Sequence, residues 1–239
     1  MSTVLARRAP VAKLAASGLL SLAVLATRDV VVLGLVLVVC LAAAPFFGIG
    51  PLSLAKRLWP VLAACAGIVV TLSLFSADRG GTTLLHFGPF LVTSSVLAAS
   101  LSLALRLLAL AVPAVLVFAS TDPTDLADSL IQHAKAPPRF AIGALAAFRM
   151  LDLFRQEWRM IAMARRARGV RQGFARTAFV LLVGAIRRGV RLSVAMDARG
   201  FDSGLARTVA RPQRFGAADS GLILGALVLA VFAFFLGTQ

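Results

Sequence analysis

Residues 30–55 read VVVLGLVLVVCLAAAPFFGIGPLSLA and contain no Asp, Glu, Lys or Arg. A helix needs roughly 20 apolar residues to cross about 30 Å of hydrocarbon, so this stretch is long enough to span a bilayer. Three further stretches, 80–105, 107–121 and 220–239, are equally free of charged residues. The sequence therefore predicts an all-α protein that crosses a membrane several times.

The composition of the whole chain agrees with this interpretation. Of its 239 residues, 59% are hydrophobic and 15% are charged, whereas soluble domains carry about 45–50% apolar and about 25% charged residues. The chain is also far too apolar to be disordered. Its two cysteines, Cys40 and Cys65, lie in apolar runs. We read them as small core residues and expect neither a disulfide framework nor a metal site.

Five membrane-spanning helices are expected, four of them within 1–121 and the last within 216–239. They lie at about 11–27, 30–47, 58–77, 90–119 and 220–236. The first is the weakest, because it is short and because Lys13 must extend its ammonium group toward water. A secretory signal is the alternative there: Arg7-Arg8 precedes an apolar stretch that ends in Val24-Leu25-Ala26. The small-x-small cleavage pattern at that end is loose.

The short connections indicate the orientation in the membrane. The N-terminal region and residues 48–57 hold five basic residues and no acidic one, whereas the opposite connections hold only Arg28/Asp29 and Asp78/Arg79. Basic residues in short loops favour the cytoplasmic side. We therefore expect the N-terminus and segment 122–215 in the cytoplasm of a cell-membrane protein, with the C-terminus outside.

Segment 122–215 carries most of the charge, with 17 of the 25 basic and 7 of the 10 acidic residues. Ser120-Thr121-Asp122-Pro123 is typical of a helix start, and Ala136-Pro137-Pro138 ends that short helix. Two long amphipathic helices should follow, at 139–168 and 175–199. The second carries an apolar stripe of Phe179, Leu182, Ile186 and Val190. Because the apolar part 177–186 is too short to span a bilayer, we expect protein to cover it.

Both long helices end alike, one in Ala167-Arg168-Gly169-Val170 and the other in Ala198-Arg199-Gly200-Phe201. Each glycine stands where a left-handed C-cap is favoured, and each arginine lies where a cation complements the helix dipole. One copy would indicate no more than a well-ended helix. Two copies on two amphipathic helices suggest two similar receiving surfaces on a partner.

This pair of motifs resembles the transmembrane T component of energy-coupling factor transporters, of the cobalt and biotin transporter type. The matching context is Phe148-Arg149, Glu157 and Met163-Ala164-Arg165-Arg166 before the first motif, and Met196-Asp197 before the second. The resemblance covers nearly the whole chain, loosely in the spans and tightly at 148–201. It departs in one respect, since Arg165, Arg166 and Arg171 spread the charge around the first motif.

The resemblance implies that each motif ends a coupling helix that docks into a groove on one of two cytoplasmic ABC-type ATPases. Arg168 and Arg199 would be the docking arginines, within Ala167–Gly169 and Ala198–Gly200. It also implies a small membrane-embedded substrate-binding subunit, the S component, and uptake of a vitamin or transition-metal ion. The chain has no G-x-x-x-x-G-K-[ST] phosphate loop. We therefore expect no enzyme activity and no cofactor of its own, with ATP bound by the partner subunits.

Arg106 stands in the middle of the fourth expected span, where an arginine is energetically costly and usually faces protein or water. It is a candidate polar site inside the membrane, contacting the S component or lining a path between subunits. Alternatively, the span ends near Arg106, or the side chain binds a carbonyl group that Pro113 leaves free. A channel or carrier that works alone, gated around Arg106, is one rival function.

Gly221 and Gly225 are four residues apart in the last span. Small residues at this spacing let helix backbones approach closely in lipid. We expect them to pack helices within the bundle, and the alternative is a docking surface for another membrane protein.

Asp122, Asp125 and Asp128 could hold a divalent metal in a membrane-embedded transferase, a second rival function. We favour solvated charge at a helix N-terminus, because no second acidic cluster exists. His86 and His133 are isolated, so they predict no metal site. A nucleic-acid partner is not expected, because the apolar stripes need cover and the chain has two tryptophans and no tyrosine. Membrane lipid is the remaining expected partner.

Overall fold

The computed structural model describes residues 8–27, 29–75, 83–87, 90–170, 173–201, 203 and 208–237. Two compact units make up the chain, one from Met1–Lys135 with Gln213–Gln239 and the other from Ala136–Pro212. Some residues used in the sequence interpretation lie outside the described ranges, namely Arg7, Arg28, Asp78, Arg79 and Arg171, as does the side chain of His86.

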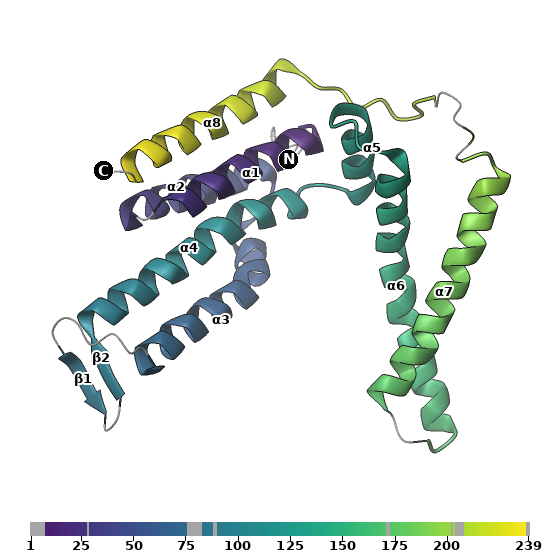
Figure 1. The fold of residues 1–239 in the computed structure, drawn as a ribbon, viewed down its shortest axis with the longest axis horizontal. Coiled ribbons are helices and arrows are strands. Elements are labelled where there is room, and N and C mark those ends of the chain that lie inside the picture. Colours follow the sequence, from purple (N-terminus) through teal and green to yellow (C-terminus); the bar gives the residue numbers. More distant parts are fainter. Residues whose placement is uncertain are drawn as a thin grey trace. The chain divides into compact units, whose positions relative to one another are not determined.

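The first unit is a bundle of helices, as expected for an all-α membrane protein (Figure 1). Its elements are α1 (Pro10–Ala26), α2 (Val30–Ala43) with the short 3-10 helix η1 (Ala44–Phe47), α3 (Pro51–Phe75), α4 (Ser94–Ala119), α5 (Pro123–His133) and α8 (Ala217–Gly237). Among the described residues, four helical stretches are long and apolar enough to cross a membrane: α2 with η1, α3, α4 and α8. The first expected span, α1, is shorter, with 17 residues and a length of about 25 Å.

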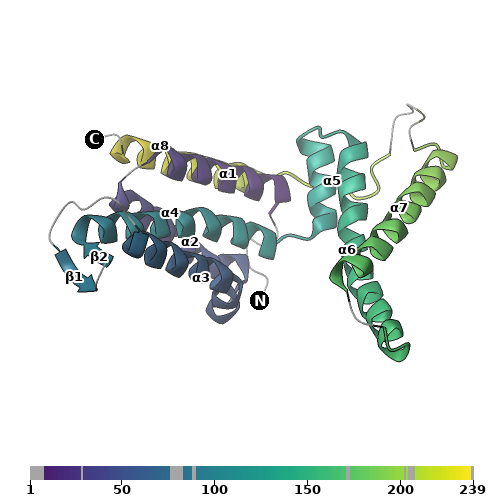
Figure 2. The same cartoon turned by 60° about the horizontal axis from the view of Figure 1, so that its bottom comes forward.

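Helices α1 and α8 lie side by side and run in the same direction (Figure 2). At their starts, the Ala9 N–H donates to the Asp219 carboxylate over 3.1 Å. At their far ends, the Thr27 hydroxyl lies 3.2 Å from the Ala233 carbonyl oxygen. Two helices that cross a bilayer in the same direction need an odd number of crossings between the end of one and the start of the other. Three crossings by α2, α3 and α4 satisfy this condition, so the parallel pairing of α1 and α8 agrees with five crossings in all.

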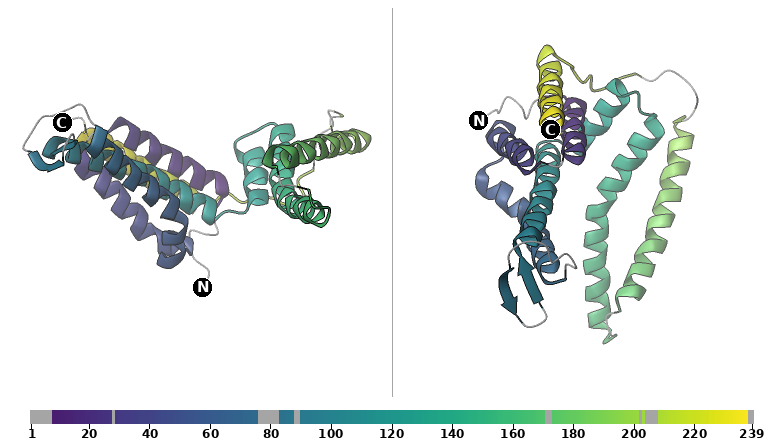
Figure 3. Two further views of the ribbon diagram at one scale, coloured as in Figure 1. Left: turned by 90° about the horizontal axis from the view of Figure 1, so that it is seen from below. Right: turned by 60° about the vertical axis from the view of Figure 1, so that its left-hand side comes forward.

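Helix α4 runs antiparallel to α1 and packs on α1, α2 and α3 (Figure 3). The buried core of the unit comes from α1, α2, α3, α4 and α8 and includes Val24, Leu33, Val36, Val112, Leu116 and Ala233. At the start of α2, the Asp29 carboxylate accepts a hydrogen bond from the Val31 N–H over 2.9 Å. This side chain therefore acts as a local helix N-cap.

Two boundaries differ from the expected ones. Helix α3 begins at Pro51 rather than near residue 58, because proline is well suited to the first helical position and Lys56 and Arg57 are tolerated at an exposed helix end. Helix α4 begins at Ser94, since residues 90–93 form a strand. Strands β1 (Thr83–Phe87) and β2 (Phe90–Thr93) pair antiparallel, with Phe87 opposite Phe90. This hairpin was not expected from the sequence, because a charge-free stretch gives no signal that separates strand from helix.

The second unit is a hairpin of two long helices, α6 (Pro138–Ala167) and α7 (Phe174–Ala198). Both agree with the expected 139–168 and 175–199. The division between the units falls elsewhere than the expected segment 122–215, because α5 packs with the membrane bundle. The Val11 N–H donates to the Ser129 hydroxyl over 3.3 Å, and the Gln213 N–H donates to the Gln132 side chain over 2.8 Å. The segments that precede and follow the second unit in the sequence, α5 and the residues from Gln213 onward, therefore both belong to the first unit.

Candidate functional site

The two Ala-Arg-Gly motifs fold into the same helix end. At the first, Gly169 has φ 67°, its N–H donates to the Arg166 carbonyl over 3.0 Å, and the Val170 N–H donates to Arg165 over 3.1 Å. At the second, Gly200 has φ 68°. Its N–H donates to Asp197 over 2.9 Å, and the Phe201 N–H donates to Met196 over 3.0 Å. These are two copies of the Schellman C-cap, which requires a left-handed residue and therefore glycine.

The arginines of the two motifs have the same backbone conformation. Arg168 has φ −91° and ψ 3°, and Arg199 has φ −92° and ψ 9°. Both side chains are exposed. In the part of the chain that the structure describes, neither guanidinium group has a hydrogen-bond or ion-pair partner. Each motif therefore offers five N–H donors on a preformed, rigid helix end.

The two motifs lie at opposite ends of α7. The first closes α6 just before the turn into α7, and the second closes α7 itself. With 25 residues in α7, the two ends are about 37 Å apart. One groove on one partner cannot hold both arginines at that distance. The geometry suits two separate receiving sites.

An ion pair joins the two helices between these ends. The guanidinium group of Arg188 in α7 forms a two-pronged ion pair with Glu157 in α6, and one of its hydrogen bonds measures 3.0 Å. Both side chains are about one third exposed. Trp158 and Phe174 add a ring contact, with 5.4 Å between their centroids. The sequence showed that Glu157 is the only glutamate, but it did not show which arginine it meets.

Among the described residues, none covers the apolar stripe of α7. Phe179, Leu182, Ile186 and Val190 are each more than half exposed. Within the described residues α6 meets a different face of α7, so the expectation that protein covers 177–186 stays a prediction about a partner. An exposed apolar surface of this extent on a rigid helix indicates a binding surface.

Polar contacts that were not expected from the sequence join the start of α1 to the end of α4 and to the start of α8. Lys13 is only 2% exposed, and its ammonium group donates to the Ser120 carbonyl over 3.2 Å. The expected extension of Lys13 toward water is therefore wrong, because the C-terminal end of α4 offers a negative dipole instead. Asp219, 3% exposed, accepts hydrogen bonds from the Ala9 and Gly216 N–H groups, over 3.1 and 2.8 Å. The spacing Gly216-x-x-Asp219 is a helix-capping signal that could have revealed it.

Arg106 binds within its own unit. Its guanidinium group donates to the Thr27 carbonyl oxygen over 2.5 Å, at the C-terminal end of α1. The carbonyl group that it binds is therefore not one left free by Pro113. A cation at this place complements the dipole of α1, and it puts Arg106 at the depth where α1 ends. Any contact between Arg106 and another subunit stays a prediction.

The close packing expected at Gly221 and Gly225 is absent within the described chain. A Cβ atom added at either glycine would meet nothing within 4 Å, because α1 contacts other faces of α8. The alternative, a surface for another membrane protein, stays a prediction.

Two of the three carboxylates considered as metal ligands lie at the start of α5, where negative charge favours the helix. Asp122 is the N-cap and accepts from the Thr124 N–H over 2.7 Å, and Asp125 lies in the first turn. No group of three His, Cys, Asp or Glu side chains within the described ranges could hold a metal ion. His133 packs against Phe215, with 5.5 Å between the ring centroids.

Comparison with known proteins gives consistent matches. The CbiQ family, described as cobalt transport protein, matches residues 1–209. Three relatives are named energy-coupling factor transporter transmembrane protein EcfT. The one from Exiguobacterium sibiricum is 27% identical over 76% of this chain and 74% of its own length. The one from Limosilactobacillus fermentum is 30% identical over 68% of this chain and 66% of its own. The one from Listeria innocua is 28% identical over 71% of each.

Proposed function

Because the chain belongs to the CbiQ cobalt transport protein family, we propose that it is the transmembrane coupling subunit of an energy-coupling factor importer. Its relatives named EcfT are described as transmembrane proteins of such transporters. The observation that carries the proposal is the pair of identical arginine helix ends, without a side-chain partner among the described residues and about 37 Å apart on one helix hairpin.

Each end docks into a groove on one of two ATPase subunits. Arginine suits this role because its planar group binds carboxylates and helix-end carbonyls through several donors at once. The Schellman turn fixes the backbone before binding, so little conformational entropy is lost on docking. When the two ATPases move relative to one another, they displace the two ends of α7 and thereby move the hairpin.

The exposed stripe of α7 is the surface that we assign to the S component, the membrane subunit that holds the substrate. Its four large apolar side chains need a partner, whereas the ATPases are engaged at the helix ends. A displacement of α7 would then move the S component directly. The cargo is a vitamin or a transition-metal ion, selected by that subunit.

The chain itself performs no catalysis in this proposal. It lacks the phosphate loop that would hold ATP, so ATP binds to the partner subunits. The N-terminus and the helix hairpin face the cytoplasm, where ATP is available. The basic residues of the short connections support this orientation.

Charge reversal at both motifs tests the proposal. Arg168→Glu with Arg199→Glu is compared with Arg159→Glu with Arg191→Glu, which changes the formal charge equally at two exposed positions of the hairpin away from both motifs. Loss of one partner of a buried charged pair costs about 3–5 kcal/mol, which corresponds to roughly 10²- to 10⁴-fold weaker binding. We expect the ATPases to co-purify with the control variant and not with the motif variant.

ATP-dependent uptake is measured in parallel in vesicles that contain the whole complex. We expect it to be lost with the motif variant and retained with the control. If the ATPases still co-purify and uptake continues with both motifs reversed, the docking role is wrong. Uptake by the purified chain alone would instead support a self-sufficient carrier.

A further inference from the structure

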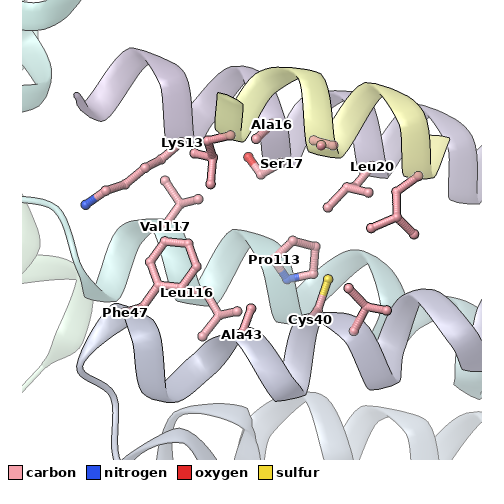
Figure 4. A pocket seen from close by; sticks show the side chains of 15 residues that line it. Lys13, Ala16, Ser17, Leu20, Cys40, Ala43, Phe47, Pro113, Leu116 and Val117 are labelled. Atoms are coloured by element: carbon pink, nitrogen blue, oxygen red, sulfur yellow. The ribbon is translucent and has the colours of Figure 1, made fainter. Parts of the chain in front are cut away.

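A narrow cavity lies inside the membrane bundle, between α1, α2, α4 and α8 (Figure 4). Its volume is about 210 Å³. Apart from Lys13, Ser17 and Cys40, all the side chains that line it are apolar. The Ser17 hydroxyl donates to the Leu14 carbonyl over 3.0 Å, so it is already hydrogen-bonded.

The cavity is elongated along the helices. On α1 it extends from Lys13 to Leu20, and on α8 from Leu222 to Leu229, which corresponds to about 10 Å along each axis. It is smaller than the roughly 300–1,000 Å³ of pockets for drug-sized molecules, and it lacks the polar groups that orient such ligands. A vitamin therefore does not fit it. Apolar cavities of this kind exclude water and accept hydrocarbon.

One side of the cavity is open. Its floor is formed by α4 and by one face of α2, where Leu116, Val117 and Cys40 are each at most 5% exposed. At its rim, Val39 on α2 and Gly225 on α8 are exposed. These two helices are candidate membrane spans, so the fluid outside this rim is the hydrocarbon of the bilayer. The absent side chain of Gly225 leaves the entrance wide, since nothing lies within 4 Å of an added Cβ.

We propose that this cavity binds a segment of one acyl chain of a membrane phospholipid, which enters laterally between α2 and α8. The long axis of the cavity follows the spanning helices, and acyl chains lie in the same direction in a bilayer. Lys13 closes the end of the cavity that lies near the starts of α1 and α8. The acyl chain therefore extends from that end toward Leu20 and Leu229. The lipid completes the bundle where its own side chains leave a gap, and it restores the dispersion contacts that an empty cavity lacks.

Thiol labelling of the wild-type chain tests the proposal without any substitution. Cys40 lines the cavity, whereas Cys65 lies on α3 outside it and contacts the Ala104 carbonyl group. The purified full chain is delipidated in digitonin, whose rigid steroid body does not fit the cavity. It is treated with N-ethylmaleimide with and without added phosphatidylglycerol. At four times the Kd roughly one fifth of the sites stay empty, so labelling of Cys40 should slow about fivefold.

Three controls sharpen this experiment. Cys65, read in the same sample by peptide mass spectrometry, should keep its rate, and glycerophosphoglycerol, the headgroup without chains, should protect neither cysteine. Gly225→Leu should abolish the lipid effect by filling the entrance. Gly221→Leu, one turn away on α8 and outside the cavity, should retain it. Equal protection of both cysteines, no protection of Cys40, or equal protection by the headgroup alone would overturn the proposal.

Discussion

Replacing Glu157 with arginine should open the hairpin of α6 and α7. The substitution removes the two-pronged ion pair with Arg188 and places two guanidinium groups face to face. Among the described residues it is the only ion pair that joins these two helices. The ring contact of Trp158 with Phe174 remains, so the helices should separate locally rather than unfold.

The expected loss of free energy that holds the α6–α7 hairpin closed lies between two limits. Fully exposed pairs contribute about 0.2–1 kcal/mol, whereas removal of one partner of a buried pair costs about 3–5 kcal/mol. Both side chains here are about one third exposed, so neutralisation by Glu157→Gln should cost about 1–2 kcal/mol. Charge reversal adds repulsion and should cost about 2–3 kcal/mol. That corresponds to a roughly 30- to 150-fold larger equilibrium constant for local opening of the affected helix segment.

Hydrogen exchange read by mass spectrometry measures this directly. The amides of α7 around Arg188 should lose protection by the stated factor in Glu157→Arg. The pair Asp152 and Arg155 supplies a matched control on α6, because both side chains are 75% exposed and their hydrogen bond also measures 3.0 Å. Asp152→Arg should change protection less than about fivefold.

The double variant Glu157→Arg with Arg188→Glu, which exchanges the two charges, tests whether the ion pair itself stabilises the hairpin. Protection of α7 should return to within about threefold of the original value, because the attraction is restored with reversed signs. If the exchanged pair stays as unprotected as the single variant, or if Asp152→Arg loses as much protection, the ion pair does not hold the hairpin together.

Three further predictions concern other contacts. Asp219→Ala leaves two backbone N–H groups without their carboxylate acceptor and should lower the free energy of unfolding by about 3–4 kcal/mol. Asp219→Asn should lower it by less, and equal thermal unfolding of both variants and the wild type would contradict this. Gly169→Ala and Gly200→Ala force a side chain into the left-handed region and should each destabilise their helix end by about 1–2 kcal/mol and weaken ATPase co-purification. Gly173→Ala, at φ −110°, should do neither, and co-purification unchanged by the two motif variants would show that the turn is not required. Arg106→Met removes the bond to Thr27 and should lower stability by about 2 kcal/mol while ATP-dependent uptake per folded complex persists. Loss of uptake without loss of stability would instead indicate a contact with another subunit.

The sequence determined the local features of this protein. Charge-free stretches placed the spanning helices, because a buried charge in hydrocarbon is costly whatever surrounds it. The two Ala-Arg-Gly motifs predicted two helix ends, and both were found with glycine in the left-handed region. This succeeded because a Schellman turn is formed by a few consecutive residues. Family membership followed from the same motifs and their context.

Only the tertiary structure decided which groups meet. It paired Lys13 with Ser120, Asp219 with Ala9, Arg106 with Thr27 and Glu157 with Arg188. Periodicity cannot supply these pairings, because lipid is as apolar as the helix surfaces and gives no preference for one neighbour over another. The choice depends on hydrogen bonds and close packing between residues far apart in the chain. Those contacts exist only once the bundle has formed.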